Sequence, residues 1–275
     1  MYRPVHSRLA SLAAFALIAL LVAIPARAIT NGTPDGNGHP NVGALVAHLP
    51  YGDVPICSGT LLSPTIFLTA GHCIVIGRES FGADSFSVTF DTAVAFDQNG
   101  TVVNGIQGTP IVDPLYGHDQ GDFHDLAVIS LASPVALPLV NLPAPGLLDQ
   151  LAARGALRGQ EFTNVGYGAT GFSFGGGQPI PDFSFVRRVS TSPFMALEPT
   201  ILKLARNTHA TGEGGTCLGD SGGPHFLEVA GRQVMVAINS LYGDHACVAN
   251  GFNTRLDTPQ ARTFLGQFVP LPSSP

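Results

Sequence analysis

The chain has 275 residues, enough for one large all-β domain or for two small domains that share an interface. Charged residues make up only 12% of it, whereas there are 33 glycines and 22 prolines, so the chain is rich in turns and poor in the charged faces of surface helices. The formal net charge is -6 and the basic residues are scattered, which argues against a nucleic-acid partner or an anionic membrane surface.

The N-terminal segment, residues 1–28, is typical of an export signal. Arg3 and Arg8 precede an apolar run from about residue 9 to residue 24, and Ala26-Arg27-Ala28 forms a small-x-small cleavage site. The alternative is an uncleaved membrane anchor, which this cleavage site disfavours. We therefore expect a secreted protein, extracellular or periplasmic if the source has an outer membrane, with no membrane association after the signal is removed.

Short apolar or alternating runs, separated by Gly, Pro, Asn and Asp, begin at Val42 and indicate β-strands. In the first half of the chain they cover residues 42–48, 60–68, 85–90 and 126–131. Such a series of short strands predicts a sandwich or a barrel.

A Pro-rich stretch over residues 134–145 interrupts the strands and precedes a helical pattern over residues 147–157. Strand-like runs resume over residues 161–167, 183–190, 234–238 and 251–256. Asp257 is a candidate cap for a C-terminal helix that reaches about Phe268, and Pro259 is tolerated in its first turn. The Pro/Ser-rich tail, residues 270–275, is expected to be loose.

All four cysteines lie after the predicted signal: Cys57, Cys73, Cys217 and Cys247. An even number of cysteines in an exported chain argues for disulfides rather than reactive thiols. Four cysteines permit three pairings, and their spacing alone selects none of them.

Three segments carry the candidate chemistry, and each offers one group. They are residues 68–73 with His72, residues 124–129 with Asp125, and residues 217–224 with Ser221. A serine hydroxyl becomes a good nucleophile when an imidazole takes its proton, and that imidazole needs a buried carboxylate to fix its tautomer. The glycines beside Ser221 would let the N–H groups of Gly219 and Ser221 meet an oxyanion at close range.

With these blocks in the order His, Asp, Ser, the sequence resembles the chymotrypsin/trypsin family of serine proteases. Residues 57–62, Ser240-Leu241 and residues 251–255 also look like the family's strands before the histidine loop and around the specificity pocket. The resemblance implies a serine-type endopeptidase with His72, Asp125 and Ser221 as its triad, acting on protein or peptide substrates without a cofactor.

The resemblance also implies an all-β fold of two packed six-stranded antiparallel β-barrels with a C-terminal helix. The first barrel, with His72 and Asp125, would occupy residues 29–140, and residues 141–160 would connect the barrels. The second barrel, with its C-terminal helix, Ser221 and the specificity pocket, would occupy residues 161–269. We expect a monomer.

Further details come only from the family pattern. Cys57 would pair with Cys73, and Cys217 with Cys247. Ile29, the first residue after the predicted cleavage site, looks like the family's activating N-terminus, whose ammonium would pair with Asp220. No propeptide separates the signal from Ile29, so export itself would activate the enzyme.

The specificity pocket departs from that of trypsin-like members, because Gly215 stands where they carry an aspartate. Arg or Lys at the scissile position is therefore not expected, and an apolar or small side chain is our hypothesis. Two extra residues between Ser240 and Cys247, relative to trypsin, leave the shape of the pocket open. The candidate substrate-binding residues are Gly215, Thr216, Ser240, Leu241, Tyr242, Gly243 and Gly251.

Some segments of the sequence also match other kinds of protein or site. Gly-x-Ser-x-Gly around Ser221 also matches the nucleophile elbow of α/β-hydrolases, but that elbow needs a following helix and the order Ser, Asp, His. A catalytically silent homologue that acts as a binding protein is the second alternative.

A metal site is suggested by one cluster of residues: His118, Asp119, Asp122 and His124. Such a cluster is more typical of a solvated turn, and no metal is expected. The acidic residues of the loop over residues 79–91 form no clear calcium-ligand pattern.

Overall fold

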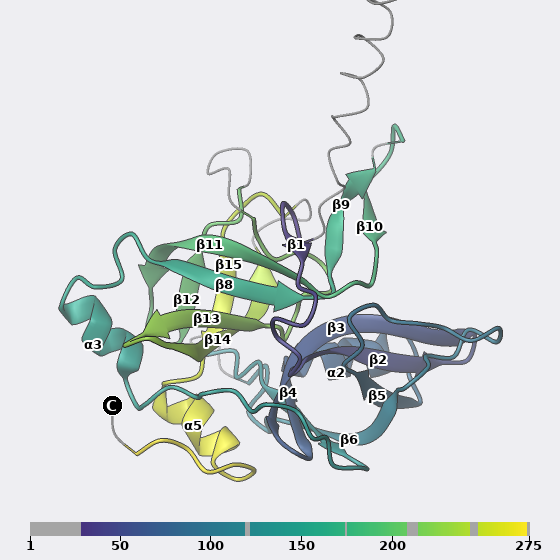
Figure 1. The fold of residues 1–275 in the computed structure, drawn as a ribbon, viewed down its shortest axis with the longest axis horizontal. Helices are drawn as coiled ribbons and strands as arrows, with labels where there is room; N and C mark the ends of the chain where they lie inside the picture. Colours follow the sequence, from purple (N-terminus) through teal and green to yellow (C-terminus); the bar gives the residue numbers. More distant parts are fainter. Residues whose placement is uncertain (1–28, 119–121, 174, 208–213, 243–246, 274–275) are drawn as a thin grey trace, which may run out of the picture.

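The computed structural model describes residues 29–118, 122–173, 175–207, 214–242 and 247–273. Its strands form two closed β-barrels that lie side by side, with short helices at their margins (Figure 1). The predicted all-β fold of two six-stranded antiparallel barrels with a C-terminal helix is confirmed. The predicted export signal lies outside the described residues, and the proposed division of the chain into domains stays a prediction.

The first barrel closes in the order β2-β3-β4-β7-β6-β5. Its strands are β2 (Val42–Leu49), β3 (Gly52–Ser63), β4 (Ile66–Thr69), β5 (Ser85–Thr89), β6 (Ile106–Val112) and β7 (Ala127–Leu131). The run over residues 60–68, expected as one strand, is divided by a turn at Pro64, because proline lacks the N–H that would continue the ladder. Sequence reasoning missed β6, which contains Gly108 and Pro110, residues that are rare in strands.

The second barrel closes because β11 pairs with both β12 and β8. Its strands are β8 (Glu161–Gly166), β11 (Arg188–Leu197), β12 (Ile201–Leu204), β13 (Pro224–Val229), β14 (Arg232–Tyr242) and β15 (Gly251–Arg255). The short strand β1 (Thr33–Pro34) joins this sheet through β11, and the hairpin of β9 (Ala169–Ser173) and β10 (Ile180–Phe183) projects from it (Figure 1). Strand β1 thus pairs with the second barrel, although it precedes the first barrel in the sequence.

Three helices accompany the strands within the described residues: α2 (Gly71–Glu79), α3 (Leu147–Ala153) and α5 (Pro259–Leu265). The predicted cap of the C-terminal helix is wrong, because Thr258, not Asp257, accepts the N–H of Ala261. Asp257 is instead paired with Arg255 and accepts the N–H of Leu148, so it ties α3 to the end of β15.

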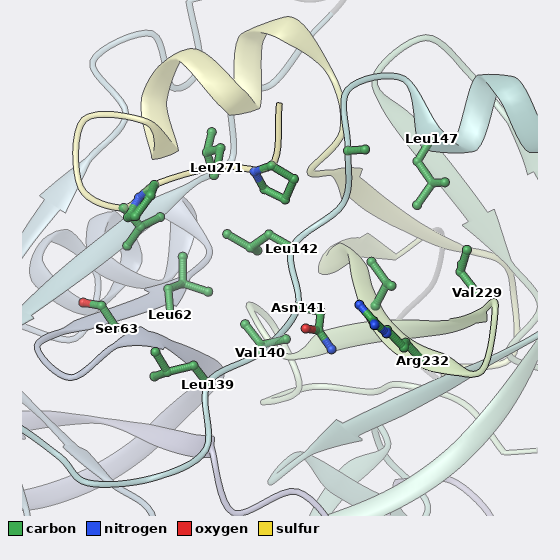
Figure 2. A pocket seen from close by; sticks show the side chains of 15 residues that line it. Leu62, Ser63, Leu139, Val140, Asn141, Leu142, Leu147, Val229, Arg232 and Leu271 are labelled. Atoms are coloured by element: carbon green, nitrogen blue, oxygen red, sulfur yellow. The ribbon is translucent and has the colours of Figure 1, made fainter. Parts of the chain in front are cut away.

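An apolar hollow of about 830 Å³ lies between the connection of the barrels and the C-terminal tail (Figure 2). Leu139, Val140 and Leu142 line it from the Pro-rich stretch over residues 134–145, Leu62 from β3 and Leu271 from the tail. None of the candidate catalytic or substrate-binding residues lines this hollow.

Candidate active site

The imidazole of His72 and the carboxylate of Asp125 are held together at two points. His72 lies in the first turn of α2, and Asp125 lies just before β7. Oδ1 of Asp125 accepts the backbone N–H of His72 at 2.8 Å, and Oδ2 lies 2.8 Å from Nδ1 of the ring. The carboxylate therefore fixes both the main chain and the ring of His72, and it favours the tautomer with its proton on Nδ1.

Asp125 is almost completely buried, and its ionisation depends on its partners. Burial acts to raise the pKa of Asp125, but the charge of His72 and the hydrogen bonds from His72 and Ser240 outweigh it, so the pKa lies below its ordinary value. The hydroxyl of Ser240 donates to Oδ2 of Asp125. Ser240, which the sequence suggested as part of the substrate-binding edge, thus directs its side chain to the carboxylate.

Ser221 lies in a tight turn between Cys217 and β13. Its carbonyl oxygen lies 3.8 Å from Sγ of Cys73, and the same sulfur lies 3.7 Å from Nε2 of His72. The imidazole and the main chain of Ser221 therefore flank one disulfide. Within the described residues no hydrogen bond joins Oγ of Ser221 to Nε2 of His72, and such bonds are often long in enzymes without substrate.

Ser58, on β3 of the first barrel, holds the Ser221 turn of the second barrel. Its N–H donates to the carbonyl of Ser221 at 2.8 Å, and its hydroxyl donates to the carbonyl of Gly219 at 3.0 Å. The same hydroxyl accepts the N–H of Tyr167 at 2.9 Å. Sequence reasoning missed Ser58, whose only signal was its place directly after Cys57.

The backbone of the turn leaves two neighbouring N–H groups unused. Among the described backbone hydrogen bonds, the N–H groups of Asp220, Gly222 and Gly223 are engaged, whereas those of Gly219 and Ser221 donate to no acceptor. Gly219 has a φ of 89°, a left-handed conformation that favours glycine. A Cβ on Gly222 would lie 2.3 Å from Oγ1 of Thr69, so the barrels approach too closely here for a side chain.

Two disulfides staple the loops on either side of this turn. Cys57 is bonded to Cys73 and Cys217 to Cys247, the pairing that the family resemblance implied. The first disulfide joins β3 to α2, which carries His72, and the second joins the segment before Ser221 to the segment before β15. The segments that bear His72 and Ser221 are thereby held covalently, whereas Asp125 is held by its hydrogen bonds.

The carboxylate of Asp220 is completely buried beneath the turn. It accepts the N–H of Gly168 and of Cys217, each at 2.8 Å. Burial raises its pKa to about 7 in spite of these bonds, because they supply too little compensation for a buried charge. The charge of Arg206 also acts to lower this pKa, but burial outweighs it, so Asp220 is a buried carboxylate whose charge is compensated only in part.

Ile29 is fully buried, and its neighbour Thr30 is joined to Gly215. The carbonyl of Thr30 accepts the N–H of Gly215 at 3.0 Å, and the hydroxyl of Thr30 donates to the carbonyl of Gly215 at 3.1 Å. No hydrogen bond or ion pair joins Ile29 to Asp220 in the part of the chain described. The structure thus seats Ile29 beside the loop that leads to Ser221.

The candidate substrate-binding residues divide into two groups. Gly215, Thr216 and Gly251 gather around Arg206, which is buried and donates to the carbonyl of Thr216 at 3.2 Å. The side chain of Leu241 is partly exposed at the end of β14. Of Tyr242 only the main chain is described, and Gly243 lies outside the described residues.

Other candidate assignments find less support. The α/β-hydrolase alternative is wrong, because a strand, β13, and no helix follows Ser221 in an all-β fold. Within the described residues, the ligand atoms of Cys57, His72 and Cys73 lie close together, but both sulfurs are used in the disulfide. His124 lies between Asp113 and Asp122, and Asp119 is outside the described residues.

The comparisons with known proteins agree with this geometry. A family model described as trypsin matches residues 36–260, which is most of the chain. A search of curated proteins finds no match.

Proposed function

We propose, since the chain belongs to the trypsin family and is a serine-type endopeptidase, that it cleaves peptide bonds with a triad of His72, Asp125 and Ser221. The observation that carries this proposal is the double contact of buried Asp125 with the main chain and ring of His72, beside the Ser221 turn. Protein or peptide substrates follow from the family.

In the proposed reaction, Nε2 of His72 takes the hydroxyl proton as Oγ of Ser221 attacks the peptide carbonyl. His72 then gives that proton to the leaving amine, and an acyl-enzyme on Ser221 remains. Water, deprotonated by His72, attacks the acyl group and restores the serine. Asp125 stays ionised throughout and stabilises the imidazolium that forms in both steps.

The oxyanion of each tetrahedral intermediate would bind the N–H groups of Gly219 and Ser221. Both groups are free of other acceptors among the described residues, and both belong to one tight turn. Ser58 supports this role from the first barrel, because it holds the carbonyls of the same two residues. Donors fixed before the reaction stabilise developing charge without reorganisation.

Activation would depend on the N-terminus of Ile29. Cleavage directly before Ile29 would create an ammonium close to the loop that Thr30 already contacts. Its charge would compensate the buried carboxylate of Asp220 and so organise the turn that carries Gly219 and Ser221. Export itself would then activate the protease.

Secretion is the proposed destination. Two disulfides are typical of proteins in oxidising compartments. In the described part of the chain no helix is long and apolar enough to span a bilayer. We propose a monomer with no nucleic-acid partner.

The test is mass spectrometry of the secreted protein before and after treatment with a fluorophosphonate, which reports the N-terminus and the labelled serine together. We expect a chain that starts at Ile29 and carries one label on Ser221. Ser221→Ala should abolish labelling and hydrolysis, whereas Ser63→Ala, at the far end of β3, should leave both unchanged. A folded, unlabelled wild-type chain would instead indicate a catalytically silent binding protein.

A further inference from the structure

A chain of polar side chains is buried within the second barrel. Its members come from five strands and are almost inaccessible to solvent: Asn164, Ser190, Ser192, His225, Asn239 and Asn253. The strand register places Asn164 opposite both Ser190 and His225, and Asn239 opposite Asn253. Directly opposed residues point to the same face of a sheet, so these side chains are neighbours.

One end of this polar chain is well satisfied. The amide nitrogen of Asn164 donates to the hydroxyls of Ser190 and Ser192 at 3.1 and 2.8 Å. Its oxygen lies 2.7 Å from Nδ1 of His225. Burial lowers the pKa of His225 to about 3, with an opposing effect from Asn253, so its ring is neutral at physiological pH.

The other end of the polar chain carries unsatisfied atoms. Nδ2 of Asn239, Oδ1 of Asn253 and Nε2 of His225 are buried and have no hydrogen-bond partner within the described residues. A buried polar group without a partner costs free energy, and native proteins keep few of them. The side chains of His225 and Asn253 act on each other, so Nδ2 of Asn239 is the donor that remains for a ligand.

Asn239 lies directly beneath the turn that bears Ser221. Its carbonyl accepts the N–H of Gly222 at 2.7 Å, and its N–H donates to the carbonyl of Gly223 at 2.9 Å. Its side-chain oxygen accepts the hydroxyl of Thr216 at 2.8 Å, which leaves the N–H groups of Nδ2 unused. Asn239 thus offers a buried donor beside the proposed substrate-binding residues.

Two glycines and the buried side chain of Arg206 lie around this donor. A Cβ on Gly215 would lie 2.9 Å from Cα of Arg206, and one on Gly251 would lie 3.2 Å from its Cδ, so both glycines border Arg206. The same position on Gly251 is 3.5 Å from Oδ1 of Asn253. The guanidinium of Arg206 donates to the main-chain carbonyls of Thr216, Ala249 and Asn250 and so holds these segments together.

We propose that Asn239 determines specificity by donating a hydrogen bond to a carbonyl oxygen at the end of the substrate side chain on the acyl side of the scissile bond. Carboxamides and carboxylates share this oxygen, so glutamine, glutamate and their shorter homologues are the substrate class. The inference rests on the proposed function, and it replaces our apolar-pocket hypothesis with a polar pocket.

The test compares matched peptides that differ only in this residue. Methionine has the length of glutamine, and leucine the size of asparagine, but neither has a carbonyl oxygen. The wild-type protein should cleave the better of the glutamine and glutamate peptides at least about tenfold faster than the methionine peptide, measured as kcat/KM. Asn239→Leu should lower this ratio about tenfold, whereas Asn99→Leu, on an exposed loop, should leave it unchanged.

A second measurement separates specificity from catalysis. Ser221→Ala protein should bind product peptides that end in glutamine or glutamate more tightly than one that ends in methionine, by calorimetry. Equal binding, or a wild-type preference for methionine or leucine, would overturn the inference whether or not peptides are hydrolysed. The ratio of kcat/KM for the glutamine peptide to kcat/KM for the glutamate peptide then tells whether the site prefers a carboxamide oxygen or a carboxylate oxygen.

Discussion

The two barrels bury different kinds of polar side chain on their strands. In the first barrel the fully buried polar residues on strands are hydroxyls: Ser58, Thr60, Thr69, Ser87 and Thr89. In the second barrel they include amides and an imidazole, on Asn164, His225, Asn239 and Asn253. A hydroxyl can bond to nearby main chain, whereas an amide or an imidazole needs partners on two sides.

This difference suggests that the first barrel serves mainly as a scaffold, whereas the second barrel also takes part in substrate recognition. Hydroxyls fit a barrel whose interior serves packing, and Phe67 and Phe86 dominate the core of the first barrel. The first barrel contributes to chemistry from its margins, where His72 and Asp125 lie beside its strands. In the second barrel, buried polar side chains extend from the interior to the Ser221 turn. Its interior would therefore take part in substrate recognition.

The largest expected effect tests the margin of the first barrel. Asp125→Asn keeps the size of the side chain but no longer favours the tautomer of His72 with its proton on Nδ1. We expect kcat to fall about 10⁴-fold at neutral pH while the thermal unfolding temperature stays close to that of the wild type. A loss below tenfold, measured with a fluorogenic peptide, would mean that Asp125 does not orient His72.

The next effect tests the buried carboxylate of the second barrel. Asp220 ionises near its ordinary 3.8 in the unfolded chain but near 7 in the folded chain when Ile29 carries no ammonium, so the folded state holds its proton more tightly. The free energy of unfolding should therefore fall as pH rises from about 4 to about 7, by roughly 4 kcal/mol in total.

A free ammonium on Ile29 should remove this loss. Urea unfolding at several pH values would compare a chain that begins at Ala28 with one that begins at Ile29. Only the chain that begins at Ala28 should lose stability over this range. Parallel curves for the two proteins would show that the N-terminus does not reach Asp220.

The smallest expected effect compares one buried polar side chain from the interior of each barrel. His225→Leu removes the partner of Oδ1 of Asn164 and should cost about 1–3 kcal/mol of unfolding free energy. Ser87→Ala in the first barrel removes a hydroxyl without a hydrogen-bond partner among the described residues, and should change stability by less than about 0.5 kcal/mol. Equal losses of unfolding free energy in denaturant titrations would show that the two barrels do not differ in this respect.

The sequence predicted features that depend on local patterns and on motifs. Alternation and turn residues located β2, β5 and β7, and the blocks around His72, Asp125 and Ser221 carried the family resemblance. Prediction from the sequence failed where tertiary contacts override local signals. The alternating pattern of β6 is obscured by Gly108 and Pro110, and Thr258 takes the cap of α5 because Asp257 is recruited by Arg255 and α3.

The supporting residues of the site were harder to predict, because their partners are far away in sequence. Ser58 holds the turn at Gly219 from 161 residues away, and Ser240 reaches Asp125 across 115 residues. A single sequence contains no record of such contacts. The polar chain of the second barrel was missed for the same reason, since Asn239 and Asn253 resemble ordinary strand or turn residues until the register pairs them.

The pairing of β1 with β11 has a consequence for the time course of folding. Thr33 lies opposite Val189, and Arg188 contacts Gly32 over a separation of 156 residues. The first described residues can therefore dock only when a strand from the second half of the chain has formed. Contacts between distant residues form slowly, so we expect the seating of Ile29 to be among the last folding steps. Proteolytic competence would then lag behind the closure of the first barrel.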